Sequence, residues 1–555
     1  MKRQEGARPR QTRIVATIGL CGDVDFPTFL QKLSEAGADV LRLNMSHADA
    51  DYAKERQILQ WANQPIASLH APAVCVMADL QGPKSRIGRV PGDGIELTAG
   101  RQVVLAPDDC DCHAEAGLLP DGTLPPMIPL PEPLGRSVMR SLHQLAVDRP
   151  GLRPSVLFGD GDIVVEIISL GVNHALGIVV AGGVLGSRKG ITIREIDVDL
   201  DPFPEKDQRD LEFCLDHGVD YVALSFVRSA ADIERVRTFI RNYRTTQGKL
   251  DQLDDVRIVA KIETLAAIEH IDSILDASDG IMIARGDLGL QLGVEEVPMV
   301  QKQLIAAARR HGKPAIVATQ MLESMIANPA PTRAEATDVF NAIVDGGDAV
   351  MLSGETSVGL RPYLVVTTMD RLARKAETWC REQSQTRGDR RAPHGMERYS
   401  PSEAHIQRIN DAFAYTAVQF AEHLPARAIV CFTRTGRTPE RLSHNRPTVP
   451  LLAFCSNERV ARQQLLFYGL HPILLKDFDA DKQKLAHMVA HARVILREQY
   501  NMLPGDAIVV TAGIDWPKGG TNALQVLIED HKAASASTLA SDGSVNTGLF
   551  ALRSS

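Results

Sequence analysis

The chain has 555 residues, too many for a single hydrophobic core, so several domains are expected. Its formal net charge of −8 argues against nucleic acid or an anionic membrane as the main partner, and its eight cysteines are too scattered for a disulfide framework. The basic N-terminus lacks a following apolar run, and no run of about 18 apolar residues occurs, which predicts a cytoplasmic protein without a membrane span.

Eight short, β-branched apolar runs alternate with helical patterns up to residue 355. Each is nearly continuously apolar until its C-terminal end, as is typical of parallel strands covered on both faces. Helical patterns follow most of them, for example at Phe26–Ala36 and Val300–His311. Eight such units favour an α/β fold of the (β/α)8, or TIM, barrel type over an open parallel sheet. The expected strands are Arg13–Ile18, Val40–Asn44, Val74–Leu80, Tyr221–Val227, Ile258–Glu263, Ile281–Asp287, Ala315–Thr319 and Ala349–Glu355.

Two segments break this alternation. Residues 88–190 are rich in Gly, Pro and Val, so we expect an inserted all-β domain after the third strand. A charged linker at 383–399 precedes a new α/β pattern over 400–532. The other expected parts are an N-terminal extension (1–11), the two barrel parts (12–87 and 191–382) and a poorly ordered Ala/Ser-rich tail (533–555).

Polar residues gather where the expected barrel strands end, and active sites of such barrels form there. Strand side chains alternate with period two, so Lys261 should share a face with Glu263, Arg285 with Asp287, and Ser353 with Glu355. Taken singly, such residues are ordinary salt bridges, caps or turn residues. Together, on one rim, they predict a functional site. The set is Arg42, Asn44, Ser46, His47, Asp79, Lys84, Arg86, Lys261, Glu263, Arg285, Asp287, Thr319, Ser353 and Glu355.

The residue types indicate a chemistry. Glu263 and Asp287, on neighbouring strands, suit a hard divalent cation such as Mg²⁺ or Mn²⁺, whereas the lack of Cys and His beside these two carboxylates argues against zinc. Arg42, Arg86 and Lys261 supply fixed positive charge for phosphate oxygens. Such parts predict phosphoryl transfer by positioning and electrostatics.

At this point the chain resembles the pyruvate kinase family, from about residue 12 to about residue 530. The resemblance implies transfer of the phosphoryl group of phosphoenolpyruvate to ADP, which gives pyruvate and ATP in glycolysis. The matching stretches are Thr17–Gly19, Arg42–His47, Lys261–Glu263, Asp279–Gly289, Ala318–Met325, Pro331–Glu335 and Met351–Thr356.

The resemblance also implies roles for individual residues. Glu263 and Asp287 would hold Mg²⁺, and Lys261 would stabilise both the transferring phosphoryl group and the enolate. Lys189 lies where the insert returns to the barrel, which fits a lid over the nucleotide. The implied substrate contacts are Arg42, Lys261, Gly286, Asp287 and Thr319; the proton relay is Thr319, Ser353 and Glu355 with water; and the nucleotide contacts are Asn44, Ser46, His47, Arg86 and Lys189.

Two departures from the family pattern affect these expectations. Many members bind K⁺ through residues that match Asn44, Ser46, Asp79 and the carbonyl of Leu80, and carry a glutamate where this chain has Lys84. The ammonium of Lys84 can replace the charge of K⁺, so we expect catalysis that does not require K⁺. After Gly190, the family's Asn-Leu-Pro-Gly is replaced by Ile191–Arg194, which concerns the lid hinge rather than the chemistry.

The C-terminal domain carries a candidate anion nest after its first strand, formed by hydroxyls, backbone N–H groups and two arginines. In the family, such loops bind a phosphorylated effector, so the resemblance implies an allosteric site for a sugar phosphate or AMP, and a homotetramer. The loop residues are Thr433, Arg434, Thr435, Gly436, Arg437 and Thr438, with Lys518, Gly520 and Thr521 from a second loop.

Two other functions stay open. A related barrel lyase or aldolase acting on pyruvate enolate can use the same metal pair, and ADP dependence distinguishes it. A catalytically silent phosphometabolite sensor is the second, and the retention of Lys261, Glu263 and Asp287 argues against it.

Overall fold

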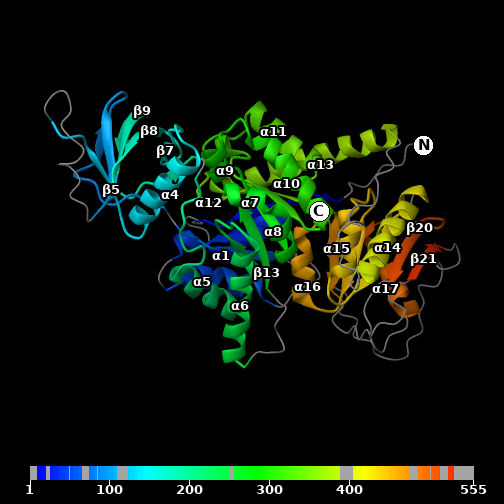
Figure 1. Cartoon of the computed structure of the whole chain (residues 1–555). Coiled ribbons are helices and arrows are strands. Elements are labelled where there is room, and N and C mark those ends of the chain that lie inside the picture. Colours follow the sequence, from blue (N-terminus) through cyan, green and yellow to red (C-terminus); the bar gives the residue numbers. More distant parts are fainter. Residues whose placement is uncertain are drawn as a thin grey trace.

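The computed structural model describes residues 9–529 except 20–24, 49–50, 65–73, 84, 109–122, 195, 249–255, 388–403, 425, 475–484, 501 and 513–522. A central barrel lies between two smaller bodies (Figure 1). The insert, in blue and cyan, lies on one side of the barrel, and the C-terminal domain, in yellow to red, lies on the other.

The central body confirms the predicted (β/α)8 barrel. Its parallel strands close in the order β1-β16-β15-β14-β13-β12-β3-β2. They are β1 (Arg13–Thr17), β2 (Val40–Asn44), β3 (Cys75–Asp79), β12 (Tyr221–Leu224), β13 (Arg257–Ile262), β14 (Gly280–Ala284), β15 (Ala315–Ala318) and β16 (Ala349–Leu352). The surrounding helices are α1 (Phe26–Ala36), α2 (Ala53–Ala62), α5 (Glu205–His217), α6 (Ala230–Thr246), α7 (Leu265–Glu269), α8 (Ile271–Ala277), α9 (Arg285–Leu292), α10 (Val297–His311), α11 (Arg333–Val344), α12 (Gly354–Ser357) and α13 (Pro362–Arg387), with short 3-10 turns η1 (Met45–His47) and η3 (Glu323–Ile326).

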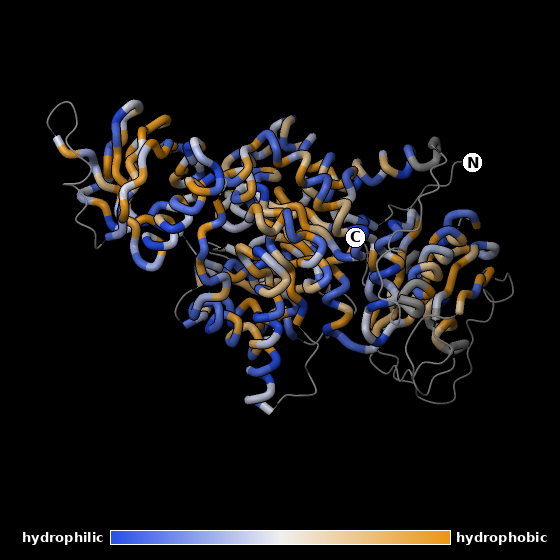
Figure 2. The backbone as a smooth tube through the Cα atoms, in the orientation of Figure 1, coloured by the Kyte–Doolittle hydropathy of each residue, from blue (hydrophilic) through white to orange (hydrophobic). Residues whose placement is uncertain are grey.

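Barrel strands are apolar on both faces because both faces are covered. In β13, Val259 packs inward with Met282, whereas its neighbour Ile258 packs into the layer between the strands and the helices. Figure 2 shows this as hydrophobic strands inside a helical shell of mixed hydropathy. The continuous apolar runs of the sequence therefore reflect two cores that share the same strands.

The insert is rich in sheet, as expected, but the prediction of an all-β domain was wrong. It contains a helix, α4 (Leu134–Asp148), which buries Leu134, Val138 and Leu142 against the sheet at the four-residue spacing of a helix face. The strands are β4 (Ile95–Leu97), β5 (Gln102–Pro107), β6 (Met127–Leu130), β7 (Ser155–Phe158), β8 (Ile163–Leu170), β9 (Ala175–Ala181), β10 (Gly183–Leu185) and β11 (Ile191–Ile193). Since β11 pairs with β7, the inserted sheet extends past the expected boundary at residue 190.

The C-terminal domain has the predicted α/β character. Its five-stranded sheet has the order β19-β18-β17-β20-β21, with β21 antiparallel to β20. The elements are α14 (Ala404–His423), β17 (Ala428–Thr433), α15 (Arg437–His444), β18 (Leu451–Cys455), α16 (Glu458–Gln463), η4 (Gln464–Leu466), β19 (Leu470–Leu474), α17 (Leu485–Tyr500), β20 (Ala507–Ala512) and β21 (Ala523–Ile528). Helix α13 runs to Arg387, into the segment expected as a linker; the remainder of that linker and the tail lie outside the described residues. No helix within the described ranges is long and apolar enough to cross a membrane.

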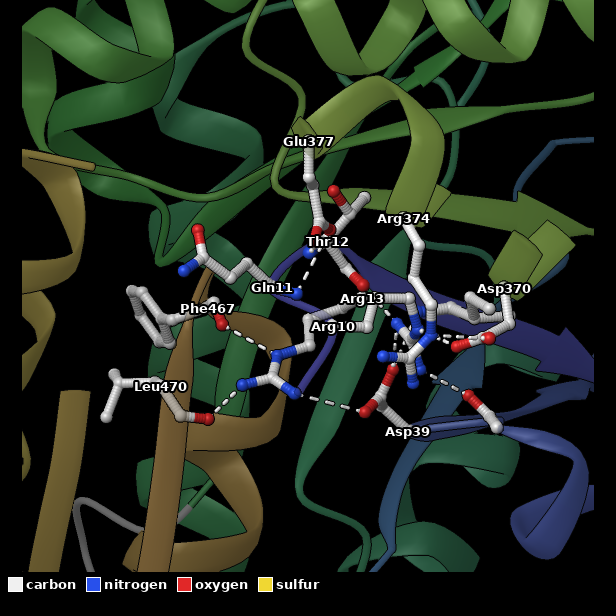
Figure 3. Close-up of polar contacts among 12 residues, drawn as sticks. Arg10, Gln11, Thr12, Arg13, Asp39, Asp370, Arg374, Glu377, Phe467 and Leu470 are labelled. Atoms are coloured by element: carbon white, nitrogen blue, oxygen red, sulfur yellow. Dashed lines mark hydrogen bonds and ion pairs between the residues drawn. The ribbon is translucent and has the colours of Figure 1, made fainter. Parts of the chain in front are cut away.

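The C-terminal domain closes the end of the barrel at which the strands begin. Leu465 and Leu466 of η4 pack with the inward-facing side chains of the barrel strands. Arg13, the first residue of β1, donates from Nε to the carbonyl of Phe467 over 2.9 Å and also donates to the carbonyl of Leu470 (Figure 3). Its Nη1 lies 3.2 Å from Oδ1 of Asp39. The opposite end of the barrel is left for the site.

Candidate active site

A cavity of about 540 Å³ lies where the barrel strands end, between the barrel and the insert. The insert contributes Asp160, Arg188 and Lys189 to its lining, and Gly161 lies so close to Leu290 of α9 that an added Cβ would be 3.1 Å from the leucine Cδ2. The insert therefore covers the cavity at the end of the barrel where the strands end. Of the residues predicted from sequence, the cavity brings together Arg42, Asn44, Ser46, Asp79, Leu80, Arg86, Lys189, Lys261, Glu263 and Asp287.

Lys261, near the end of β13, is the most connected cation of the cavity. Its Nζ lies 2.9 Å from Oε1 of Glu263 and 3.2 Å from Oδ1 of Asp79, and donates to Oγ of Ser225 over 2.7 Å. Burial alone would lower the pKa of this ammonium, but the two carboxylates outweigh burial and raise its pKa above the ordinary value. Lys261 is thus a permanently charged donor in a shielded place.

Asp79, at the end of β3, holds a second cation beside Lys261. It accepts from Nε of Arg42 over 2.7 Å, and Nη2 of Arg42 lies 2.6 Å from the same oxygen, Oδ2. Nη1 of Arg42 donates to Oγ of Thr17 over 2.9 Å. Burial would raise the pKa of Asp79, but Lys261 and Arg42 lower it below its ordinary value. Asp79, which matches a K⁺ ligand of the family that the sequence resembles, thus lies between Arg42 and Lys261.

Glu263 and Asp287 carry unbalanced negative charge. Burial raises the pKa of both carboxyl groups; Lys261 counteracts this, while Asp287 raises the pKa of Glu263 further. Three carboxylates, counting Asp79, face two cations, so a divalent cation fits this donor set and relieves the repulsion. Among the described residues there is no group of three or more His, Cys, Asp or Glu side chains able to hold a metal. A metal here would complete its shell with water and substrate oxygens.

The structure corrects where two expected pairs lie. Strand β14 ends at Ala284, and Arg285 and Asp287 are in the first turn of α9 rather than at a strand end. Residues two apart on a helix point in diverging directions, so the pair does not share a face. Asp287 lines the cavity, whereas Arg285 turns to Asp338 of α11. Likewise β16 ends at Leu352, and Glu355 lies on α12.

The expected proton relay and two further predicted contacts are not among the residues that line the cavity. Oγ of Thr319 accepts from the N–H of Gly286 over 2.8 Å, and Gly286 precedes Asp287. Glu355 is 2% exposed, and its two oxygens accept from the N–H groups of Leu322 and Ser353 over 3.1 and 2.7 Å. The residues outside the lining are His47, Gly286, Thr319, Ser353 and Glu355.

The hinge of the insert contributes two basic residues, Arg86 and Lys189, to the cavity lining. Arg86 and Gly190 form an antiparallel bridge, and the N–H of Ile87 donates to the carbonyl of Lys189 over 3.0 Å. Arg86 and Lys189 therefore come from adjacent backbone segments. Asn44 caps η1 by accepting from the N–H of Ser46 over 3.2 Å. Lys84, the proposed substitute for K⁺, lies outside the described residues.

Comparison with known proteins agrees with this geometry. The family model of the pyruvate kinase barrel domain matches residues 9–116 and 146–366, and that of the pyruvate kinase alpha/beta domain matches residues 411–527. The chain belongs to the pyruvate kinase family. It is therefore a phosphotransferase with the pyruvate kinase function, as predicted from its motifs.

Individual pyruvate kinases match along almost the whole chain. The pyruvate kinase of Corynebacterium glutamicum is 38% identical, over 93% of this chain and 97% of its own length. That of Methylorubrum extorquens is 34% identical, over 94% and 97%. A crystal structure of a pyruvate kinase from Cryptosporidium parvum aligns with a TM-score of 0.77 at 29% identity, covering 94% of this chain and 96% of that one.

Sequence reasoning missed several residues of this candidate site. Ser225, buried after β12, donates to the carbonyl of Leu80 over 2.6 Å and accepts from Lys261. The N–H of Phe226, in left-handed backbone at φ 53°, donates to Oε2 of Glu263 over 2.7 Å. Ser225 follows an apolar run, so the signal used for the other strands was available at this one. Asp160 in a loop of the insert had no such signal.

The candidate effector loop follows β17. Gly436 takes a left-handed conformation at φ 85°, and its N–H donates to Oγ of Thr433 over 2.9 Å. Arg434, Thr435 and Arg437 are exposed. Lys518, Gly520 and Thr521, expected to close on the same ligand, lie outside the described residues.

Proposed function

We propose that this pyruvate kinase transfers the phosphoryl group of phosphoenolpyruvate to ADP, with Mg²⁺ or Mn²⁺ held by Glu263 and Asp287. The observation that carries the proposal is the placement of Lys261, whose ammonium is 2.9 Å from Glu263 and 3.2 Å from Asp79. A charged donor thus stands beside the carboxylates that suit a divalent cation. The bound cation supplies neutralisation of the phosphoryl oxygens during transfer.

Arg42 and Lys261 bind the phosphoryl end of phosphoenolpyruvate. Both are fixed by Asp79 before the substrate arrives, so little reorganisation is needed when charge develops. Lys261 then stabilises the enolate that remains. The N–H groups around Gly286 and Asp287, with the Thr319 hydroxyl, bind the small carboxylate.

Protonation of the enolate runs through Thr319 and Ser353 with ordered water. Glu355 takes part by orientation, since its oxygens hold the N–H groups of Ser353 and Leu322, just beyond the Thr319 turn. Its burial keeps this arrangement away from bulk solvent.

Asn44, Ser46, His47, Arg86 and Lys189 bind the nucleotide. The hinge bridge at Arg86 and Gly190 makes the insert a lid whose closure brings Lys189 over the phosphates and excludes water. We also propose that K⁺ is not required, because Lys84 supplies its charge.

A phosphorylated effector, a sugar phosphate or AMP, is proposed for the loop Thr433–Thr438. A physical route to the site supports it. Oε1 of Glu440, just after this loop in the chain, lies 2.6 Å from Nη2 of Arg257, and Arg257 begins the strand that carries Lys261. We further propose a homotetramer by resemblance to the family. Ile409 and Phe420 of α14, 51% and 46% exposed, offer apolar surface for subunit contact, and light scattering in solution tests this.

The test is pyruvate formation from phosphoenolpyruvate with ADP and Mg²⁺, with and without K⁺ at fixed ionic strength, in the parent and in Lys261→Met. We expect activity without K⁺ and a loss of about 10²–10³-fold or more in the variant. A rise above about tenfold on adding K⁺ keeps the phosphotransferase and overturns the Lys84 argument. Absence of ADP-dependent activity, with candidate effectors present, overturns the proposal in favour of a lyase or a silent sensor.

A further inference from the structure

Two consecutive residues after β15 (Ala315–Ala318) adopt a conformation that their side chains disfavour. Thr319 has φ 68° and Gln320 has φ 54°, both in the left-handed region. Neither residue is glycine, and threonine is β-branched, so the left-handed conformation of this turn is unfavourable without contacts from the surrounding structure. Non-glycine residues persist in this region when their surroundings over-determine the backbone.

The surroundings here are dominated by one side chain, Arg285. Its Nη2 donates to the carbonyl of Thr319 over 2.7 Å, and its Nε donates to the carbonyl of Ala318 over 3.2 Å. The guanidinium is 10% exposed, and its Nη1 is fixed by Oδ1 of Asp338 at 2.7 Å. The planar fork thus binds the two successive carbonyls that flank the start of the turn, while a carboxylate of α11 anchors it from behind.

The same turn is tied to the helix that carries a proposed metal ligand. Arg285 is the first residue of α9, and the N–H of the next residue, Gly286, donates to Oγ of Thr319 over 2.8 Å. Asp287 follows directly and lines the cavity. One side chain therefore fixes the turn that bears Thr319 relative to the helix start that bears Gly286 and Asp287.

We propose that Arg285 is a positioning residue for catalysis: it holds the left-handed turn at Thr319–Gln320 so that the Thr319 hydroxyl and the Gly286 N–H keep a fixed relation. The inference rests on the proposed role of Thr319 in binding and protonating the substrate. The sequence predicted that Arg285 shares a face with Asp287. The proposal instead assigns Arg285 a role away from the cavity that Asp287 lines. A lysine cannot reproduce this task, because its ammonium lacks the planar fork.

The experiment combines removal of the clamp with relief of the backbone conformation. In Arg285→Gln we expect kcat to fall by about 10–100-fold, because small misplacements of reacting groups are costly, with KM for ADP little changed. Arg285→Lys should recover only a small part of kcat. Gln320→Gly in the Arg285→Gln background should restore kcat by about threefold or more, since glycine adopts positive φ without strain. Gln320→Ala in the same background should restore nothing.

Controls separate this inference from the function on which it rests. Arg235→Gln removes an exposed arginine and should leave kcat unchanged, and circular dichroism with thermal melting checks that each variant is folded. Thr319→Ala tests the role of Thr319 itself: if it keeps full activity, the proposed function of Thr319 fails. If Thr319→Ala is impaired but Arg285→Gln is not, or Gln320→Ala rescues as well as Gln320→Gly, the positioning role of Arg285 is wrong.

Discussion

The two ends of the barrel both bury charged side chains, yet they balance charge differently. Where the strands begin, buried aspartates lie directly against arginines: Nε of Arg462 lies 3.1 Å from Oδ1 of Asp220, and Nη2 of Arg446 lies 3.1 Å from Oδ1 of Asp348. Where the strands end, Asp79, Glu263 and Asp287 share Arg42 and Lys261 beside an open cavity.

This difference separates a structural seam from a site of chemistry. At the seam, Leu465 and Leu466 pack among the inward-facing side chains, and arginines of the C-terminal domain neutralise Asp220 and Asp348. Within the cluster at the other end, the three carboxylates Asp79, Glu263 and Asp287 share two cations, and this local excess suits a divalent metal with its substrate. Buried charge alone therefore does not mark an active site; an unbalanced set beside a cavity does.

The largest effect should come from breaking the unbalanced end. Glu263→Gln removes a proposed metal ligand and is expected to lower kcat by about 10²–10³-fold or more. Its metal-free melting temperature should stay level or rise, because a repelling buried charge disappears. The Mg²⁺-induced rise in melting temperature should vanish. The matched control at the other end, Asp220→Asn, should melt lower while keeping the Mg²⁺ response. An Mg²⁺ response that survives in Glu263→Gln contradicts the assignment.

The second effect concerns the balanced end. Arg462→Met leaves Asp220, which is fully buried, without its closest cation and should lower the free energy of unfolding by about 3–5 kcal/mol. Arg235→Met breaks an ion pair with Asp201 that is about half exposed, and should cost less than about 1 kcal/mol. Urea denaturation of the two variants, followed by fluorescence, makes the comparison. Equal losses would mean that burial of the seam pair contributes nothing.

Features with a local pattern could be predicted from the sequence, whereas features that depend on tertiary packing could not. Strand positions such as β2 and helix α1 were predicted to the residue, because continuous apolar runs and amphipathic periodicity are local signals. Lys261, Glu263 and Asp287, which the sequence placed together because polar residues after apolar runs are conspicuous, all line one cavity. Arg285 was misassigned because the boundary between β14 and α9 depends on tertiary packing rather than on the local pattern.

Contacts across domains carried no sequence signal. Leu466 looks like any apolar residue of a short helix, and nothing in the sequence places it among the inward-facing side chains of the barrel strands. Helix α4 was missed because the Gly- and Pro-rich composition around it favoured strands. Asp160 approaches the site through the arrangement of the insert, which single-sequence patterns do not encode.

A further effect tests the apolar part of the seam. Leu466→Ala should cost about 2–5 kcal/mol of stability, because a fully buried side chain leaves a cavity at the closed end of the barrel. Leu503→Ala, at a position 42% exposed in the C-terminal domain, is the matched control with a much smaller expected loss. The kcat of folded Leu466→Ala should stay close to the parent value. A large drop in kcat without loss of stability would mean that Leu466 affects the chemistry at the other end of the barrel.

The smallest effect on basal activity should come from changes in the effector loop and in the ion pair of Arg257 with Glu440, which connects that loop to β13. Arg434→Ala alters the exposed effector loop, and Arg257→Met removes the partner of Glu440 at the start of β13, so both should leave basal kcat within about twofold. The two variants should differ in their response to added AMP and a set of sugar phosphates. Arg434→Ala should lose binding, measured by calorimetry, because an arginine that contacts phosphate is gone. Arg257→Met should bind but no longer raise activity, because the route along β13 to Lys261 is cut. If Arg257→Met is activated like the parent, the seam is structural alone and the effector acts by another path.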